Sequence, residues 1–125
     1  MTASGSPRDL PFEVSLYAAV VASDPTNVEA LMALGEAHTR TGDYVQGLDV
    51  DQRLSRLRPE DPVVHYNLAC SLSLLGRREA ALSTLERAVT LGYTDLVHLD
   101  KDPDLEAVRQ DPRFAALRGR LSKTL

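Results

Sequence analysis

The sequence is poor in cysteine and in aromatic residues, and it has no tryptophan. Cys70 is the one cysteine among 125 residues, and aromatic residues make up 5%. A single cysteine cannot form a disulfide within one chain, so the fold must be stable without such a cross-link. Because large aromatic rings are scarce, the core must be built mainly from leucine, alanine and valine, which favours closely packed helices.

The chain also lacks an excess of positive charge and any long apolar run. It carries 14 basic and 18 acidic side chains and a net charge of −4, which argues against a nucleic-acid-binding surface. No apolar run approaches the roughly 20 residues of a membrane span, and no segment resembles a signal peptide. We therefore expect a cytoplasmic protein without nucleic-acid or membrane partners, and its arginine-rich, lysine-poor composition suggests a bacterial source.

The sequence repeats itself at a spacing of 34 residues. Apolar, small and turn-forming residues coincide between the two copies, whereas the polar residues between them differ. This pattern is typical of an array in which each copy is one packing unit. The coinciding pairs are Pro25 and Pro59, Leu34 and Leu68, Gly35 and Ala69, Gly42 and Gly76, Gly47 and Ala81, Leu48 and Leu82, and Leu57 and Leu91.

Each copy contains two amphipathic segments separated by a glycine. Apolar residues recur at three- and four-residue spacing on both sides of Gly42 and of Gly76, and glycine suits the left-handed position that ends a helix. Each copy is therefore predicted to be an antiparallel helix pair. The expected helices span residues 11–23, 28–41, 44–57, 62–75 and 78–91, followed by shorter helices at 96–100, 103–110 and 112–122.

The two copies, EALMALGEAHTRTGDYVQGLDVDQRLSRLRPED and VVHYNLACSLSLLGRREAALSTLERAVTLGYTD, resemble tetratricopeptide repeats (TPRs). The resemblance rests on a leucine followed by a small residue in each copy (Leu34-Gly35 and Leu68-Ala69), on the glycine turns, and on Pro59, Ala81 and Ala88. It implies an all-α fold, a right-handed α-solenoid of antiparallel helix pairs, of the small bacterial type with a C-terminal capping segment. Small residues at Gly35 and Gly47 would let paired helices approach closely.

We expect a single domain over residues 1–125. It would comprise a flexible tail (1–10), an N-terminal capping helix (11–23), two repeats (24–61 and 62–95) and a C-terminal cap (96–125). In the cap, Asp102 and Asp111 each precede a proline and suit the N-cap position of a helix. Phe114, Leu117 and Leu121 share one face of the last predicted helix, and they are expected to cover the second repeat.

The sequence contains no recognisable catalytic, cofactor-binding or metal-binding motif. His65 and Cys70 lie five residues apart, so they point about 140° away from each other on one helix and cannot act as base and nucleophile. The repeat register places His65 in the core and Cys70 on the inner face. We expect no enzyme, although the unassigned histidine and cysteine residues keep that alternative open. His38 and Asp51 replace leucines of the other copy, and we predict that they hydrogen-bond to each other.

The resemblance implies a protein-interaction module whose first helices line a concave groove for a peptide or partner protein. Its acidic side chains favour a basic or neutral ligand with apolar anchors. The alternative function is a self-associating or chaperone-like assembly factor, which could be a homodimer. Two further alternatives concern the groove: the C-terminal segment or a second copy of the chain fills it, or the partner binds to the arginine-rich last helix instead. The expected groove residues are Glu29, Met32, Glu36, Thr39, Arg40, Val63, Tyr66, Asn67, Cys70, Ser73 and Leu74.

Overall fold

The computed structural model describes residues 10–124, and every regular element in that range is a helix. Of the expected flexible tail, residues 1–9 lie outside the described residues, and Leu10 already begins a helix. Backbone contacts divide the chain into two compact units, Met1–Leu57 and Arg58–Leu125, so the single domain stays a prediction. Among the described helices, none combines the length and the apolar character needed to cross a membrane.

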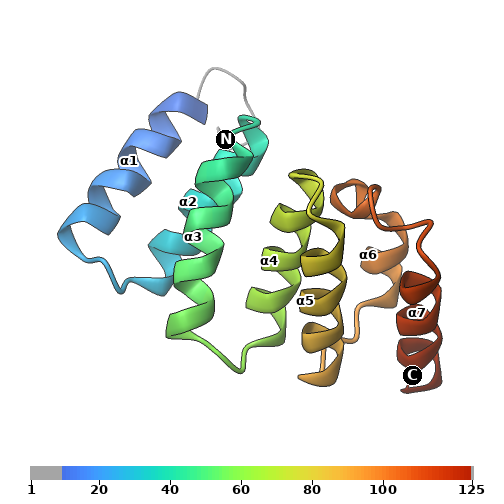
Figure 1. Cartoon of the computed structure of the whole chain (residues 1–125). Helices are drawn as coiled ribbons and strands as arrows, with labels where there is room; N and C mark the ends of the chain where they lie inside the picture. The colour runs from blue at the N-terminus through green and yellow to red at the C-terminus, as the bar shows by residue number, and fades with distance from the viewer. Residues whose placement is uncertain (1–9, 125) are drawn as a thin grey trace. The chain divides into compact units, whose positions relative to one another are not determined.

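The first unit contains α1 (Leu10–Ser23), α2 (Val28–Arg40) and α3 (Tyr44–Leu57), and α2 packs against both of the others (Figure 1). The side chain of Asn27 begins α2, because its Oδ1 accepts a hydrogen bond from the Ala30 backbone N–H at 3.0 Å. Apolar spacing predicted the helix α2, and the structure adds the Asn27 cap at its start.

Two glycines explain how α2 and α3 form a tight antiparallel pair. Gly42 has φ = 79° and connects the helices in a left-handed conformation that costs glycine little. A Cβ atom added at Gly35 would lie 3.3 Å from Cγ1 of Val50, closer than most carbon contacts. The expected close approach of the two helices at Gly35 is therefore confirmed.

The second unit begins with a second antiparallel pair and continues into the cap. Its elements are α4 (Pro62–Leu74), α5 (Arg78–Thr90), α6 (Leu96–Lys101), the short 3₁₀ helix η1 (Pro103–Leu105) and α7 (Pro112–Thr124). Asp61 caps α4 by accepting from the backbone N–H groups of Val63 and Val64. Gly76, with φ = 74°, makes the turn into α5.

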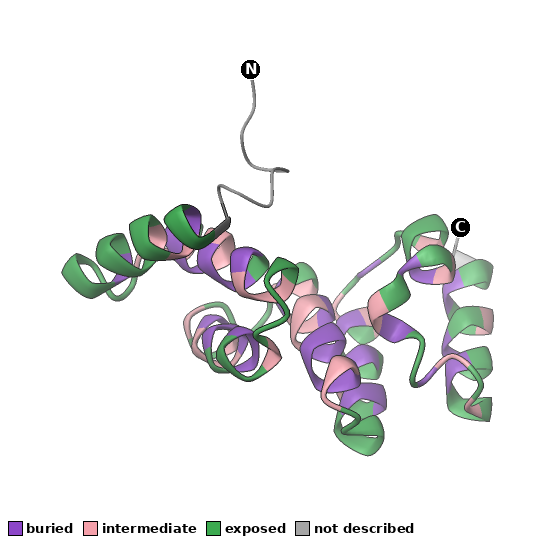
Figure 2. Ribbon diagram, turned by 90° about the horizontal axis from the view of Figure 1, so that it is seen from above, coloured by how far each residue is buried: buried purple, intermediate pink, exposed green. Residues whose placement is uncertain are grey.

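The cap buries a continuous set of apolar side chains in the second unit. The helix α7 packs against α5 and α6, and η1 packs against α4. Figure 2 shows the buried residues of these elements in purple, facing the inside of the unit. Phe114, Leu117 and Leu121 of α7 are buried, as expected, together with Leu99, Leu105 and Val108. That residues 96–125 act as the cap of a repeat stays a prediction.

The structure corrects the helix predicted over residues 103–110. Only Pro103–Leu105 is helical there, as one 3₁₀ turn, and a series of turns follows. Backbone hydrogen bonds join each acceptor to a donor three residues later, as from Asp111 N–H to the Val108 carbonyl at 3.0 Å. The guanidinium of Arg109 donates to the carbonyls of Leu99 and Asp100, so this segment folds back toward α6.

Candidate partner-binding surface

The inner face of α4 is largely covered by the cap of its own unit. Tyr66 is 3% exposed, and Cys70 and Ser73 are also buried. Cys70 and Ser73, which were expected in an open groove, are therefore enclosed here, whereas Tyr66, although nearly buried, still lines a hollow beside α4. The alternative, a C-terminal segment lying on it, is correct for Tyr66 and Cys70, because η1 packs against α4 and Asp102 contacts both side chains.

Asp102 connects the cap to α4 through its carboxylate. The Tyr66 hydroxyl donates to Oδ2 of Asp102 at 2.6 Å, and the Cys70 thiol donates to the same atom at 3.6 Å. The other oxygen accepts from the backbone N–H of Asp104 at 3.0 Å, as expected of an N-cap. His98 Nε2 lies 3.1 Å from Oδ2. This buried carboxylate therefore has several partners.

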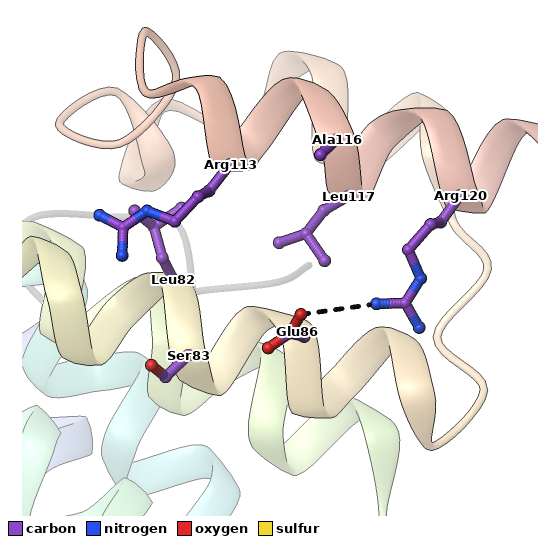
Figure 3. Close-up of a pocket in the computed structure, with 7 residues that line it drawn as sticks. All are labelled: Leu82, Ser83, Glu86, Arg113, Ala116, Leu117 and Arg120. Carbon is purple, nitrogen blue, oxygen red and sulfur yellow. Dashed lines mark ion pairs between the residues drawn. The ribbon is translucent and has the colours of Figure 1, made fainter.

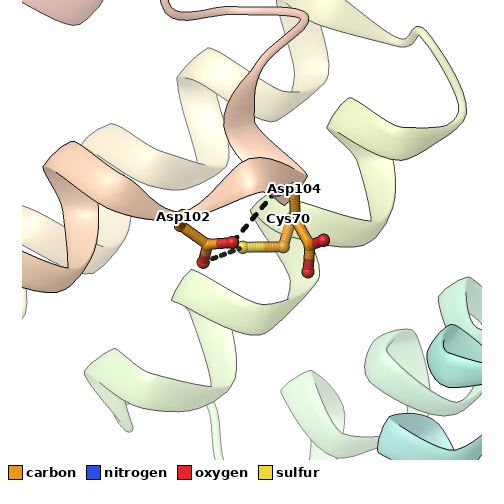
Figure 4. Close-up of side chains that lie close together, drawn as sticks. All are labelled: Cys70, Asp102 and Asp104. Atoms are coloured by element: carbon orange, nitrogen blue, oxygen red, sulfur yellow. Dashed lines mark hydrogen bonds between the residues drawn. The ribbon is translucent and has the colours of Figure 1, made fainter.

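The same cluster has the composition of a possible metal site. Cys70, Asp102 and Asp104 each place one ligand atom within 4.8 Å of the others (Figure 4). Burial, with the nearby Asp102 as a smaller cause, raises the pKa of the Cys70 thiol well above its usual value. A cysteine that binds a metal does so as a thiolate, whereas this thiol keeps its proton and donates a hydrogen bond to Asp102. Hydrogen bonds to Asp102 from the Cys70 thiol and the Asp104 N–H explain why these residues lie together. That the chain has no metal site stays a prediction.

The buried thiol makes a direct prediction about Cys70. Because the thiolate is the reactive form and burial disfavours it, Cys70 should not react with a thiol reagent in the folded protein. We expect full labelling only after urea unfolding, measured by mass spectrometry. The matched control is Val45→Cys, at a position 65% exposed, whose new thiol should react in the folded state. Equal native reactivity of both thiols would contradict the burial of Cys70.

His65 and Cys70 do not come together, as expected. His65 is half-buried rather than in the core, so that part of the prediction is wrong. Its Nε2 lies 2.8 Å from the Pro59 carbonyl oxygen, in the turn that precedes α4. Side chains in the first turn of a helix lean toward its N-terminus, which explains why His65 reaches this turn.

An open hollow remains beside the first half of α4, with a volume of about 320 Å³. Val63 is 46% exposed here, and Asn67 is half-buried. The turn between α5 and α6 forms the opposite wall. The lining residues are Pro62, Val63, Tyr66, Asn67, Gly92, Tyr93, Thr94, Asp95 and His98. Leu74, the remaining groove residue expected on α4, is half-buried and lies outside this lining.

The hollow combines a rigid aromatic wall with polar groups. The rings of Tyr66 and Tyr93 stack in parallel, with centroids 4.3 Å apart. Burial raises the pKa of Tyr93 to about 12, so its hydroxyl stays protonated at neutral pH. Asp95 caps α6 by accepting from the His98 N–H at 3.0 Å. Both rings are nearly buried, at 3% and 7% exposure, so Val63 is the most exposed large apolar side chain of the lining.

Tyr93, Asp95 and His98 are not among the groove residues expected from the sequence. They follow Gly92, whose φ of 113° lets the chain turn after α5. The Tyr93 N–H then donates to the Ala88 carbonyl at 2.9 Å, which fixes the turn. The Leu91-Gly92 dipeptide was an available signal, because a glycine after an amphipathic run ends a helix.

The expected groove residues of the first unit lie on α2 with mixed exposure. Glu29, Glu36 and Arg40 are exposed, whereas Met32 and Thr39 are half-buried. Arg40 lies 3.9 Å from Glu36 and 3.5 Å from Glu13 of α1, so part of the acidic character expected on α2 is neutralised. The Thr39 hydroxyl donates to the Gly35 carbonyl of its own helix. Glu29 and Met32 are left as the side chains best able to meet a partner.

The predicted hydrogen bond between His38 and Asp51 is also corrected. His38 Nδ1 instead lies 3.9 Å from Asp43 Oδ2. The reason is the turn at Gly42, where the Asp43 N–H donates to the His38 carbonyl at 2.8 Å and brings the two residues together. Asp51 instead directs Oδ1 toward Gly35, at 3.3 Å from where a Cβ would lie.

The arginine-rich last helix is largely engaged with acidic side chains of its own unit. Arg113 Nη2 donates to Glu79 Oε1 at 2.9 Å, and Arg118 Nε donates to Asp100 Oδ1 at 2.7 Å. Figure 3 shows Arg120 of α7 directed toward Glu86 of α5, at 3.7 Å, beside a hollow of about 160 Å³. Such pairing weakens the alternative of an anion-binding surface on this helix.

Comparison with known proteins supports the repeat architecture of the second unit. Residues 64–103 match the family model of the tetratricopeptide repeat, a match that runs from α4 to the start of η1. The match covers the second sequence copy. The first copy, over residues 29–61, remains a prediction as a repeat of this family.

The chain is also similar to parts of several longer proteins. It is 35% identical over 86 residues to a chloroplastic protein of Arabidopsis thaliana, covering 66% of this chain and 26% of that protein. It is 31% identical over 99 residues to a peroxisomal targeting signal receptor of Candida albicans, covering 79% and 17%. A TPR repeat-containing protein of Picosynechococcus is 37% identical over 65 residues, covering 52% and 17%.

The chain thus spans about a quarter or less of the length of these relatives. They come from a plant, a yeast and a cyanobacterium, so the similarity does not single out a bacterial type of repeat protein. The helix pair, its glycine turn and the family match agree on the second unit. Residues 64–103 of this chain form a tetratricopeptide repeat.

Proposed function

We propose that this protein is an interaction module that holds an extended segment of a partner protein in the hollow beside α4. The relatives support the general class, since one of them is named as a receptor for a peroxisomal targeting signal. We do not attribute the signal that this receptor binds to the present chain. What we propose for this chain is a kind of contact, in which a helix pair and its adjoining turn hold a protein segment.

The exposed Val63 at the rim of the hollow carries this proposal. A valine that is 46% exposed beside Pro62 and the Tyr93 ring offers an apolar contact that its own unit leaves open. Interfaces gain most of their affinity from a few such apolar or aromatic contacts surrounded by polar atoms. We expect one apolar side chain of the partner to contact this wall.

The polar lining defines the remaining chemistry of the partner. The Asn67 amide offers both donors and an acceptor, which suits the N–H and C=O groups of an extended backbone. Asp95 contributes negative charge to the lining of the hollow. A basic or neutral segment is therefore favoured over an acidic one.

The test is selection from a random peptide library, followed by affinity measurement on single peptides by fluorescence anisotropy. Val63→Gln removes the apolar contact without adding charge, and we expect it to weaken binding about tenfold or more. Val45→Gln is the matched control, because it makes the same change at an exposed valine of α3, away from the hollow, and this variant should bind normally. A library without binders, or equal affinity of both variants, would contradict the proposal.

The exposed apolar side chains of α1 favour the alternative of a self-associating protein. Catalysis by Cys70 is disfavoured, because its thiol is buried and its pKa is raised by that burial. The expectation that the chain is not an enzyme stays a prediction.

A further inference from the structure

The helix α1 carries an apolar stripe that the described residues of its unit leave exposed. Phe12 is 68% exposed, Leu16 46% and Val20 36%, and these residues are spaced four apart on one face of the helix. Figure 2 shows most of α1 in green, the colour of exposed residues. Scattered exposed apolar residues are ordinary, but three in a row on one face indicate a contact surface.

The repeat register shows which kind of surface this is. Positions in α1 correspond to positions in α3 at the spacing of 34 residues, so Leu16 corresponds to Val50 and Val20 to Leu54. Both residues of α3 are buried, at 3% and 1% exposure. Val50 faces α2, since it would contact a Cβ at Gly35. In α3 this face is covered by α2, the preceding helix of the pair. Leu16 and Val20 therefore have positions that a packed helix covers in the repeat, whereas Phe12 corresponds to the exposed Gln46.

We propose that the stripe of Phe12, Leu16 and Val20 pairs with the same stripe of a second copy of this chain, as two antiparallel α1 helices. A two-fold axis through Leu16 would place Leu16 against its counterpart and Phe12 against Val20 of the other copy. Large and small side chains then alternate across the contact, and the same surface serves both copies, as in most two-fold dimers.

Charge favours a second copy over a charged partner. A two-fold axis brings equal charges close together, so a self-pairing face must be nearly free of them. Glu13 is the one charged residue of α1, and it is buried and lies 3.5 Å from Arg40 of α2. An acidic or basic partner would find no complementary charge on this stripe.

The area of the stripe is small for a stable dimer. The three exposed side chains offer roughly a few hundred Å² per copy, below the ~800 Å² per partner of a standard interface. The dimer should accordingly be weak and form reversibly with rising concentration.

The experiment is sedimentation velocity of the 125-residue chain over a wide concentration range. We expect the wild type to shift from monomer to dimer as concentration rises. Leu16→Arg places two positive charges at the axis and should keep the chain monomeric. The control Val45→Arg, at a residue 65% exposed on α3, should dimerise like the wild type. Circular dichroism should show that both variants retain the helical fold.

A second measurement tests the geometry. Leu16→Cys should form a disulfide-linked dimer under mild air oxidation, because the two introduced thiols would face each other across the axis. The wild type and Val45→Cys should stay unlinked under the same conditions. A chain that remains monomeric at all concentrations, a dimer that persists in Leu16→Arg, or equal cross-linking at positions 16 and 45 would overturn the proposal.

Discussion

Replacing Phe114 with alanine is expected to lower the free energy of unfolding of the second unit by about 3–5 kcal/mol. Phe114 is 4% exposed and lies in the first turn of α7, which packs against α5. Its ring has the Arg109 guanidinium 5.5 Å from its centroid. Removing the ring leaves a cavity that the surrounding leucines cannot fill without moving, and it also removes this cation–π contact.

Urea unfolding followed by far-ultraviolet circular dichroism measures this loss, since the chain has no tryptophan to report by fluorescence. Phe12→Ala is the matched control, because Phe12 is 68% exposed. Measured at a concentration where the chain is monomeric, it should change stability little. If Phe114→Ala costs no more than Phe12→Ala, or if deletion of residues 112–125 leaves the melting temperature unchanged, α7 does not stabilise the repeat.

Replacing Asp102 with alanine is expected to be the second most damaging change. The substitution leaves the buried Tyr66 hydroxyl without its acceptor, which costs about 1–3 kcal/mol. It also removes the side-chain acceptor of the Asp104 N–H at the start of η1, a further loss of about 1 kcal/mol. The melting temperature and the urea midpoint should both fall.

A double-mutant cycle separates the Tyr66 contact from the capping role of Asp102. Tyr66→Phe removes the hydroxyl but can keep the ring stacked on Tyr93. In that background Asp102→Ala should cost less than in the wild type, because the unpaired hydroxyl is no longer present. Equal costs in both backgrounds would show that the Tyr66 to Asp102 hydrogen bond contributes nothing to the stability of the cap.

The sequence alone was sufficient for the helices and their ends in both pairs. Apolar spacing and the glycines at 42 and 76 act within a few residues, so a local pattern predicts the helices and their ends. The 34-residue spacing also predicted the close approach of α2 and α3. It aligns Gly35 with Ala69, and a small side chain at this position leaves room for the paired helix. The burial of Phe114 followed from its place on the apolar face of α7.

The state of the inner face of α4 could not be predicted in this way. Tyr66 has the sequence position of an open groove residue, yet it donates a hydrogen bond to Asp102, 36 residues later in the chain. The sequence showed that Asp102 could cap a helix. It could not show that the remaining oxygen of that carboxylate would lie against α4, because this depends on how a series of turns folds back.

The carboxylates that lie next to His38 and Arg113 were likewise decided by tertiary structure. The sequence offers several aspartates and glutamates as possible neighbours, and the packing of the helices determines which of them lies close. The turn at Gly42 brings Asp43 to His38, and the packing of α7 on α5 brings Glu79 to Arg113. Repeat spacing determines which positions face inward, but which surface remains open depends on the segments that pack over it, and those contacts join residues far apart in the chain.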